Sequence, residues 1–118
     1  MTPTQLSLKK LKEEGFHAQV VEKWNAFARI RIDLFGAIDI LGVKVGRNGC
    51  TGIQATSTGN INARVTKSLG IPAIRDFILS GNKFVVWGWA KRGERGKRKI
   101  WTLKERELTA DDFLVKPI

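Results

Sequence analysis

Two β-prone segments separated by a tight turn constrain the fold most strongly. Residues 37–45 and 50–57 are rich in apolar and β-branched side chains, and the sequence Gly-Arg-Asn-Gly at 46–49 lies between them. Glycine and asparagine in such a position are typical of the turn that joins two antiparallel strands. The turn therefore brings the second segment back beside the first, and we expect a β-sheet that contains this hairpin.

One more strand and an extension of the first hairpin strand are predicted before this hairpin. Residues 16–24 are β-prone, and residues 28–34 alternate between apolar and charged side chains, as a half-buried strand does. The second of these segments should bend at Gly36 and continue into residues 37–45. The first half of the chain is thus predicted to supply three strands of a sheet.

Helices are predicted where apolar residues recur at helical spacing between a capping residue or proline and a glycine. The predicted helices are 4–14 with Thr4 as N-cap, 60–70 with Asn60 as N-cap, 72–81 with Pro72 in the first turn, and a short helix that begins at Thr109. Residues 83–90 and 99–105 are predicted to be strands of a C-terminal hairpin.

The order of helix, three strands, helix, strand and strand predicts an α/β fold with a mixed central sheet and helices packed on it. A length of 118 residues fits a single domain over 1–118. A single cysteine excludes an internal disulfide, and no apolar stretch is long enough to span a bilayer. The N-terminus also lacks the apolar core of a signal peptide, so a cytoplasmic location is expected.

The charge points to a polyanionic partner. Lysine and arginine number 21 against 11 acidic residues, which gives a net charge of +10. Nucleic acid, and DNA in particular, is the favoured partner. An anionic membrane is a weaker candidate, because neither a lipidation signal nor a long apolar helix accompanies the charge.

Asp39 stands out because it lies in an apolar strand. A carboxylate in that setting is costly unless it is hydrogen-bonded, paired or bound to a cation. Asp33 precedes it across the flexible Gly36, although an aspartate beside a glycine often only caps a turn. Gln54 and Thr56 lie two apart on the returning strand, so both point to one face. These oxygen-bearing side chains could converge on a hard cation such as Mg²⁺.

The element order and these residues resemble the PD-(D/E)XK nuclease superfamily, particularly its small Holliday-junction-resolvase-like members from phages and archaea. The resemblance covers roughly residues 4–90. That family carries an acid on its second core strand and an acid-any-residue-lysine triplet on the third. Asp39 matches the first acid, and Gln54-Ala55-Thr56 stand in place of the triplet.

The resemblance implies a restriction-endonuclease-like α-β-β-β-α-β core, followed here by a C-terminal basic β-hairpin, and a homodimer. It also implies Mg²⁺, or Mn²⁺ as a substitute, bound by Asp39, Gln54, the carbonyl of Ala55 and Asp33 as the second carboxylate. Thr56 would orient a water or a ligand.

The chain departs from the family pattern at the triplet. Gln54 is neutral, and Thr56 lacks the charge of the family's lysine, for which Lys44 or Lys67 are candidates. The family's acid on the first helix has no clear match, although Glu13, Glu14 and Glu22 are near in sequence.

Basic residues gather in two places outside this site. Arg64 and Lys67 share one face of a predicted helix, where they either contact phosphates or form a solvated basic face. The segment 91–99 holds half of the net charge and only Glu94 opposes it. Its flexible loop suits contact with a phosphate backbone. The basic residues of this segment are Lys91, Arg92, Arg95, Lys97, Arg98 and Lys99.

The flanking strands of this segment carry Trp87, Trp89 and Trp101. Exposed tryptophans could stack on bases, but we expect at least two of the three to be buried in the core. The sequence as a whole predicts a Mg²⁺-dependent DNA endonuclease, possibly structure-specific, acting on branched DNA. Two alternatives stay open: a non-catalytic DNA- or RNA-binding module on a degenerate nuclease fold, and a small RNA-associated structural protein.

Overall fold

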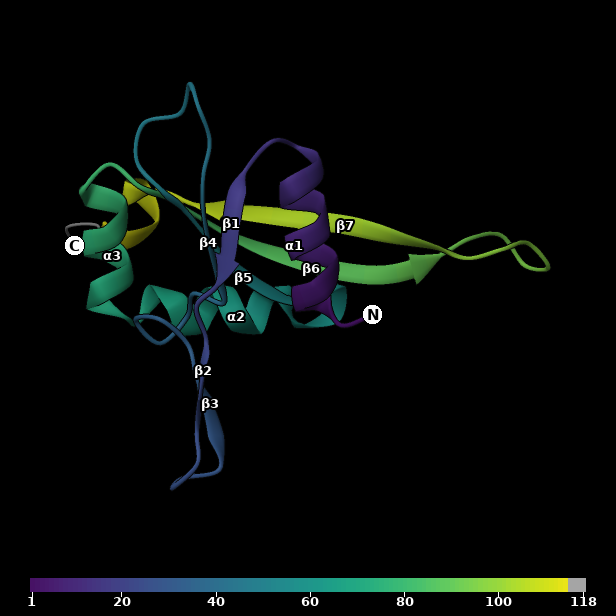
Figure 1. Cartoon of the computed structure of the whole chain (residues 1–118), viewed down its shortest axis with the longest axis horizontal. Coiled ribbons are helices and arrows are strands. Elements are labelled where there is room, and N and C mark those ends of the chain that lie inside the picture. The colour runs from purple at the N-terminus through teal and green to yellow at the C-terminus, as the bar shows by residue number, and fades with distance from the viewer. Residues whose placement is uncertain (115–118) are drawn as a thin grey trace.

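A mixed five-stranded sheet forms the centre of the molecule (Figure 1), for which a computed structural model describes residues 1–114. Neighbouring strands are antiparallel except for the parallel pair β5 and β6. In spatial order the strands are β1 (His17–Val20), β4 (Ile40–Val43), β5 (Thr51–Ser57), β6 (Lys83–Arg92) and β7 (Ile100–Leu108). The α/β fold with a mixed central sheet is therefore confirmed.

Helices cover both faces of this sheet. Helix α1 (Pro3–Glu13) packs on one face, whereas α2 (Ile61–Leu69) and α3 (Pro72–Leu79) pack on the other. The last two helices form the crossover between β5 and β6, and a crossover of this kind is what parallel neighbours require. No helix within residues 1–114 is long and apolar enough to cross a membrane.

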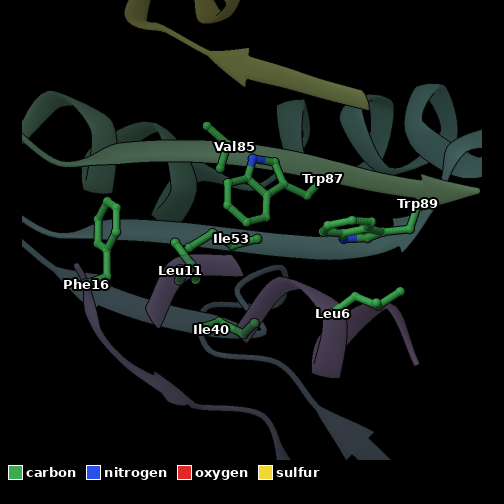
Figure 2. Packing of buried hydrophobic residues seen from close by; sticks show 8 residues of the cluster. All are labelled: Leu6, Leu11, Phe16, Ile40, Ile53, Val85, Trp87 and Trp89. Carbon is green, nitrogen blue, oxygen red and sulfur yellow. The ribbon is translucent and has the colours of Figure 1, made fainter. Parts of the chain in front are cut away.

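Two apolar clusters lie on the two faces of the sheet because side chains alternate along β6. Phe84 and Val86 point towards α2 and α3, whereas Val85, Trp87 and Trp89 point towards α1. Figure 2 shows the cluster beneath α1, which consists of Leu6, Leu11, Phe16, Ile40, Ile53, Val85, Trp87 and Trp89.

The expectation of buried tryptophans is confirmed for Trp87 and Trp89. Each indole N–H has a partner: that of Trp89 donates to Ser7 Oγ at 2.8 Å, and that of Trp87 donates to Glu105 Oε2 at 2.9 Å. Gly88 between them allows α2 to approach β6, because a Cβ there would lie 2.5 Å from the side chain of Ile61.

The prediction of one long strand through Gly36 is wrong. Strand β3 (Ile30–Ile32) pairs instead with β2 (Lys23–Asn25) in a separate two-stranded sheet that projects from the molecule (Figure 1). Residues 16–24 are likewise divided between β1 and β2. The alternation in β3 fits a strand, but Ile30 and Ile32 are exposed because no layer covers this sheet.

Most other predicted elements are confirmed, with corrections at two helix caps. The β4–β5 and β6–β7 hairpins form, Pro72 lies in the first turn of α3, and Thr109 is the N-cap of the short 3₁₀ helix η2 (Ala110–Phe113). Helix α1 is capped by Thr2 rather than Thr4, through a capping box with Gln5. Asn60 occupies the N-cap position of α2 but its side chain makes no capping bond, since its backbone (φ −104°, ψ 3°) is not in the extended conformation that suits an N-cap.

Candidate functional site

Three carboxylates from separate segments converge at one edge of the core. Glu22 lies between β1 and β2, Asp33 follows β3, and Asp39 directly precedes β4. One carboxylate oxygen from each lies within 4.8 Å of those of the other two. Such an arrangement brings together three groups that repel one another whenever all are ionised.

The backbone around Asp39 fixes its position between two neighbouring strands. Its N–H donates to the carbonyl of Ile53 at 2.8 Å, and its carbonyl accepts from the N–H of Val21 at the same distance. The side chain is held as well: Asp39 Oδ2 accepts from Gln54 Nε2 at 2.9 Å and from the N–H of Ala55 at 2.8 Å. Both of these bonds are made by Oδ2, so Oδ1 is left to face another partner.

The hairpin formed by β2 and β3 explains how Glu22 meets Asp33. Lys23 pairs with Ile32 in the register of this hairpin, so the residues one step beyond the pair lie opposite each other. Asp33 therefore lies beside Glu22 because β2 and β3 pair as an antiparallel hairpin. Glu22 also accepts from Arg31 Nη1 at 2.9 Å, which places one positive charge next to the three acids.

The environment of Asp39 disfavours its charged form. Its side chain is 4% exposed, and burial raises the pKa of Asp39 to about 8. Hydrogen bonding to Asp33 and the negative charges of Asp33 and Glu22 contribute to the rise, whereas the N–H of Ala55 opposes it. A bound cation would remove this penalty, because it favours the ionised carboxylates that surround it.

Gln54 adds a buried amide to the acidic cluster. The residue is 3% exposed, and within residues 1–114 its Oε1 has no hydrogen-bond partner. An unpartnered buried carbonyl is costly to the fold. The nitrogen of the same amide donates to Asp39, so the amide group lies next to that carboxylate. The donors are all oxygen, which suits a hard cation such as Mg²⁺.

The structure thus brings together Asp33, Asp39 and Gln54, as the sequence predicts, and adds Glu22. It does not bring in every predicted residue. Thr56 is buried on the same strand face as Gln54, but within residues 1–114 no hydrogen bond joins its hydroxyl to the carboxylates. Ala55 contacts Asp39 through its N–H, whereas the resemblance assigns the metal contact to its carbonyl.

The remaining candidates for missing family residues lie elsewhere. Glu14 forms an ion pair with Lys10 at the end of α1, at 3.0 Å, and Glu13 lines a groove beside that helix. Lys44 follows β4, whereas Asp39 precedes it, so the length of the strand separates them. Its ammonium instead lies 5.6 Å from the ring centroid of Phe16. Sequence reasoning missed Arg31 as the cation that contacts the acidic cluster.

Most of the predicted basic residues are exposed. Arg64 is half-buried and Lys67 is exposed on α2. All six basic residues of segment 91–99 are exposed, and the loop that carries them projects beyond the sheet (Figure 1). Lys91 lies over the ring of Trp101, at 5.1 Å from its centroid, and Lys97 pairs with Glu94 at 3.1 Å.

A groove with a volume of about 560 Å³ lies between α1 and the 91–99 loop. Lys9 and Lys10 line it from the helix, and Arg98 and Lys99 line it from the loop. Trp101 contributes an aromatic surface to the same groove. None of the three carboxylates of the acidic cluster lines this groove, so the two are different places on the molecule.

No protein-family model, curated protein or solved structure matches the chain.

Proposed function

We propose that this protein is a Mg²⁺-dependent endonuclease that hydrolyses phosphodiester bonds in DNA, on a fold of the PD-(D/E)XK type. The observation that carries the proposal is the convergence of the Glu22, Asp33 and Asp39 carboxylates, with the buried amide of Gln54 hydrogen-bonded to Asp39. Three repelling carboxylates and an unsatisfied buried amide oxygen are unfavourable alone. Together they form an oxygen-rich set of ligands for a divalent cation.

The order of the elements supports the nuclease assignment. With the projecting β2–β3 hairpin set aside as an insertion, the chain runs through one helix, three antiparallel strands, helices and a parallel strand. That is the α-β-β-β-α-β order that the resemblance implies. Asp39 and Gln54 lie at the second and third of these strands, where the family carries its first acid and its triplet.

The proposed function gives these residues the following roles as ligands. Asp39, Asp33, Glu22 and Gln54 Oε1 would hold the cation. A Mg²⁺ ion held there would polarise a bound phosphate and lower the pKa of a bound water. Without a cation the three carboxylates repel a phosphate, so the same residues make DNA binding at the site depend on the metal.

Two departures from the family pattern have counterparts in the structure. Glu22 provides a carboxylate where Gln54 is neutral, so the site keeps three acidic side chains. Arg31 lies against Glu22 and provides a positive charge where Thr56 replaces the family's lysine. A guanidinium group such as that of Arg31 can stabilise negative charge by donating hydrogen bonds, but it does not serve as a general acid or base.

A non-catalytic nucleic-acid-binding module is the second candidate. The basic groove between α1 and the 91–99 loop favours it, because this surface can bind phosphates without the acidic cluster. Binding alone would then be independent of Mg²⁺.

Cleavage assays separate the two functions. Linear, flapped and four-way-junction DNA would be incubated with the parent protein in Mg²⁺, Mn²⁺ or EDTA. We expect metal-dependent cleavage, and a loss of at least about a hundredfold in Asp39→Asn, because the variant removes a metal-binding charge with little change in shape. Asp76→Asn, on the exposed surface of α3, is the matched control and should cleave like the parent. Equal cleavage by Asp39→Asn and the parent would rule out this site.

A further inference from the structure

The two-stranded hairpin of residues 23–32, here called the arm, exposes an unusual amount of apolar surface. It projects from the molecule beyond both core layers (Figure 1). Trp24 is 61% exposed, Phe27 is fully exposed, and Ile30 and Ile32 are each about half exposed. Single exposed apolar residues are common, but several on one short projection indicate a binding surface.

The base of the arm is the acidic cluster. Glu22 directly precedes the arm and Asp33 directly follows it, so the two ends of the arm carry two of the three carboxylates. The ion pair between Arg31 and Glu22 fixes the arm to the cluster. Any molecule that the arm binds is therefore held next to the candidate metal ligands.

The charge of the arm favours a polyanion over another copy of the chain. Residues 23–32 contain Lys23, Arg29 and Arg31 and no acidic residue. Two arms brought together would place like charges side by side, which disfavours self-association. A nucleic acid offers both negative phosphates for the basic residues and flat bases for the apolar ones.

The turn at the end of the arm holds Phe27 outwards. Asn25 Oδ1 accepts from the N–H of Phe27 at 3.0 Å and from the N–H of Ala28 at 3.1 Å, as in an asparagine-initiated turn. Arg29 then adopts a left-handed conformation with φ of 53°, which closes the turn. An aromatic ring presented in this way can stack on a base that is not already stacked in a duplex.

We propose that the arm grips DNA beside the acidic cluster and that Phe27 stacks on an unpaired base. The inference rests on the proposed function and adds the substrate class: DNA with unstacked bases, such as a flap or a branch point. Lys23, Arg29 and the arm's strands track the flanking backbone. Phe27 lies five residues beyond Glu22, roughly 15 Å along a strand, so a phosphate a few nucleotides from the stacked base lies at the cluster.

The test compares Phe27→Ala with a control variant, Val45→Ala. Val45 lies in the loop between β4 and β5, and its apolar side chain is 97% exposed, as fully as that of Phe27. Dissociation constants for flapped and fully paired DNA would be measured by fluorescence anisotropy in Mg²⁺, with backbone linkages near the flap base that resist hydrolysis, so that the metal is present and the DNA is not cleaved. For flapped DNA we expect Phe27→Ala to bind about 5- to 150-fold more weakly than the parent, the range that one base–aromatic stack provides. The effect on paired DNA should be smaller, and Val45→Ala should differ by less than about threefold on both.

A fluorescent adenine analogue at the flap base provides a second readout. The emission of this analogue should change when the parent binds and change much less when Phe27→Ala binds. Phe27→Trp restores an aromatic ring, so its binding should change the emission as the parent's does. Unchanged affinity and emission in Phe27→Ala would overturn the role of the arm while leaving the metal site to be judged by Asp39→Asn. Loss of a dimer in sedimentation, with unchanged DNA affinity, would identify the arm as a self-association surface and overturn the inference. A parent that binds no DNA at all would overturn the proposed function as well.

Discussion

The acidic cluster and the 91–99 loop both crowd like charges together, but in opposite surroundings. Three of the chain's 11 acidic residues meet within 4.8 Å, and one of them, Asp39, is buried. The loop crowds six basic residues, all of them exposed. Water and salt screen the loop, whereas the burial of Asp39 weakens the screening of its repulsion by Glu22 and Asp33.

The two regions therefore differ in their effect on the stability of the fold. Exposed charges of one sign contribute little to stability, so the loop is tolerated without any compensating ligand. The cluster is unfavourable in the ligand-free protein, as the raised pKa of Asp39 reflects. Strongly shifted pKa values gather at functional sites, which makes the cluster the more informative of the two regions.

The pH dependence of stability should reveal this contrast most strongly. In the folded protein burial raises the pKa of Asp39 from its ordinary value of 3.8 to about 8. The stabilisation from the bound proton is therefore complete below pH 3.8 and is lost as the pH rises towards 8. In EDTA we expect the free energy of unfolding to fall by about a few kcal/mol as the pH rises across this range.

Urea unfolding at several pH values measures this effect. Asp39→Asn cannot ionise, so its stability should vary much less with pH, and Asp76→Asn should follow the parent. Parallel pH profiles for the parent and Asp39→Asn would show that Asp39 carries no such shift.

The basic loop should respond to salt rather than to pH. If about three of its basic residues reach phosphates, replacing Arg92, Arg95, Lys97 and Arg98 by glutamine should flatten the log–log salt dependence of duplex binding by roughly two to three units. The loss of affinity should be similar for all sequences, since phosphate contacts position the protein without reading bases. Stability should change by less than about 0.5 kcal/mol. An unchanged slope would show that the loop faces away from DNA.

The sequence predicts the central part of the site because a short turn sets the register of its strands. The hairpin at 46–49 brings Gln54 beside Asp39, and the alternation along a strand determines which side chains share a face. The basic loop is predictable for a similar reason, since its charges are contiguous in sequence.

Glu22 and Arg31 escape such reasoning because their positions depend on the arm. The alternation of residues 28–34 indicates a strand, but not which sheet the strand joins. Only the pairing of β3 with β2 returns Asp33 to Glu22 and places Arg31 against it. The exposure of Ile30 and Ile32 likewise depends on whether another layer covers the arm, which local sequence does not specify.

Binding of Mn²⁺ to the DNA-free protein tests the central claim most directly. A titration followed by electron paramagnetic resonance, with Mg²⁺ as competitor, would compare the parent, Asp39→Asn and Asp76→Asn. The account predicts a saturable site in the parent and in Asp76→Asn, displaced by Mg²⁺, and affinity at least about tenfold weaker in Asp39→Asn, which loses a charged ligand. No saturable binding by the parent, or equal binding by Asp39→Asn, would contradict it.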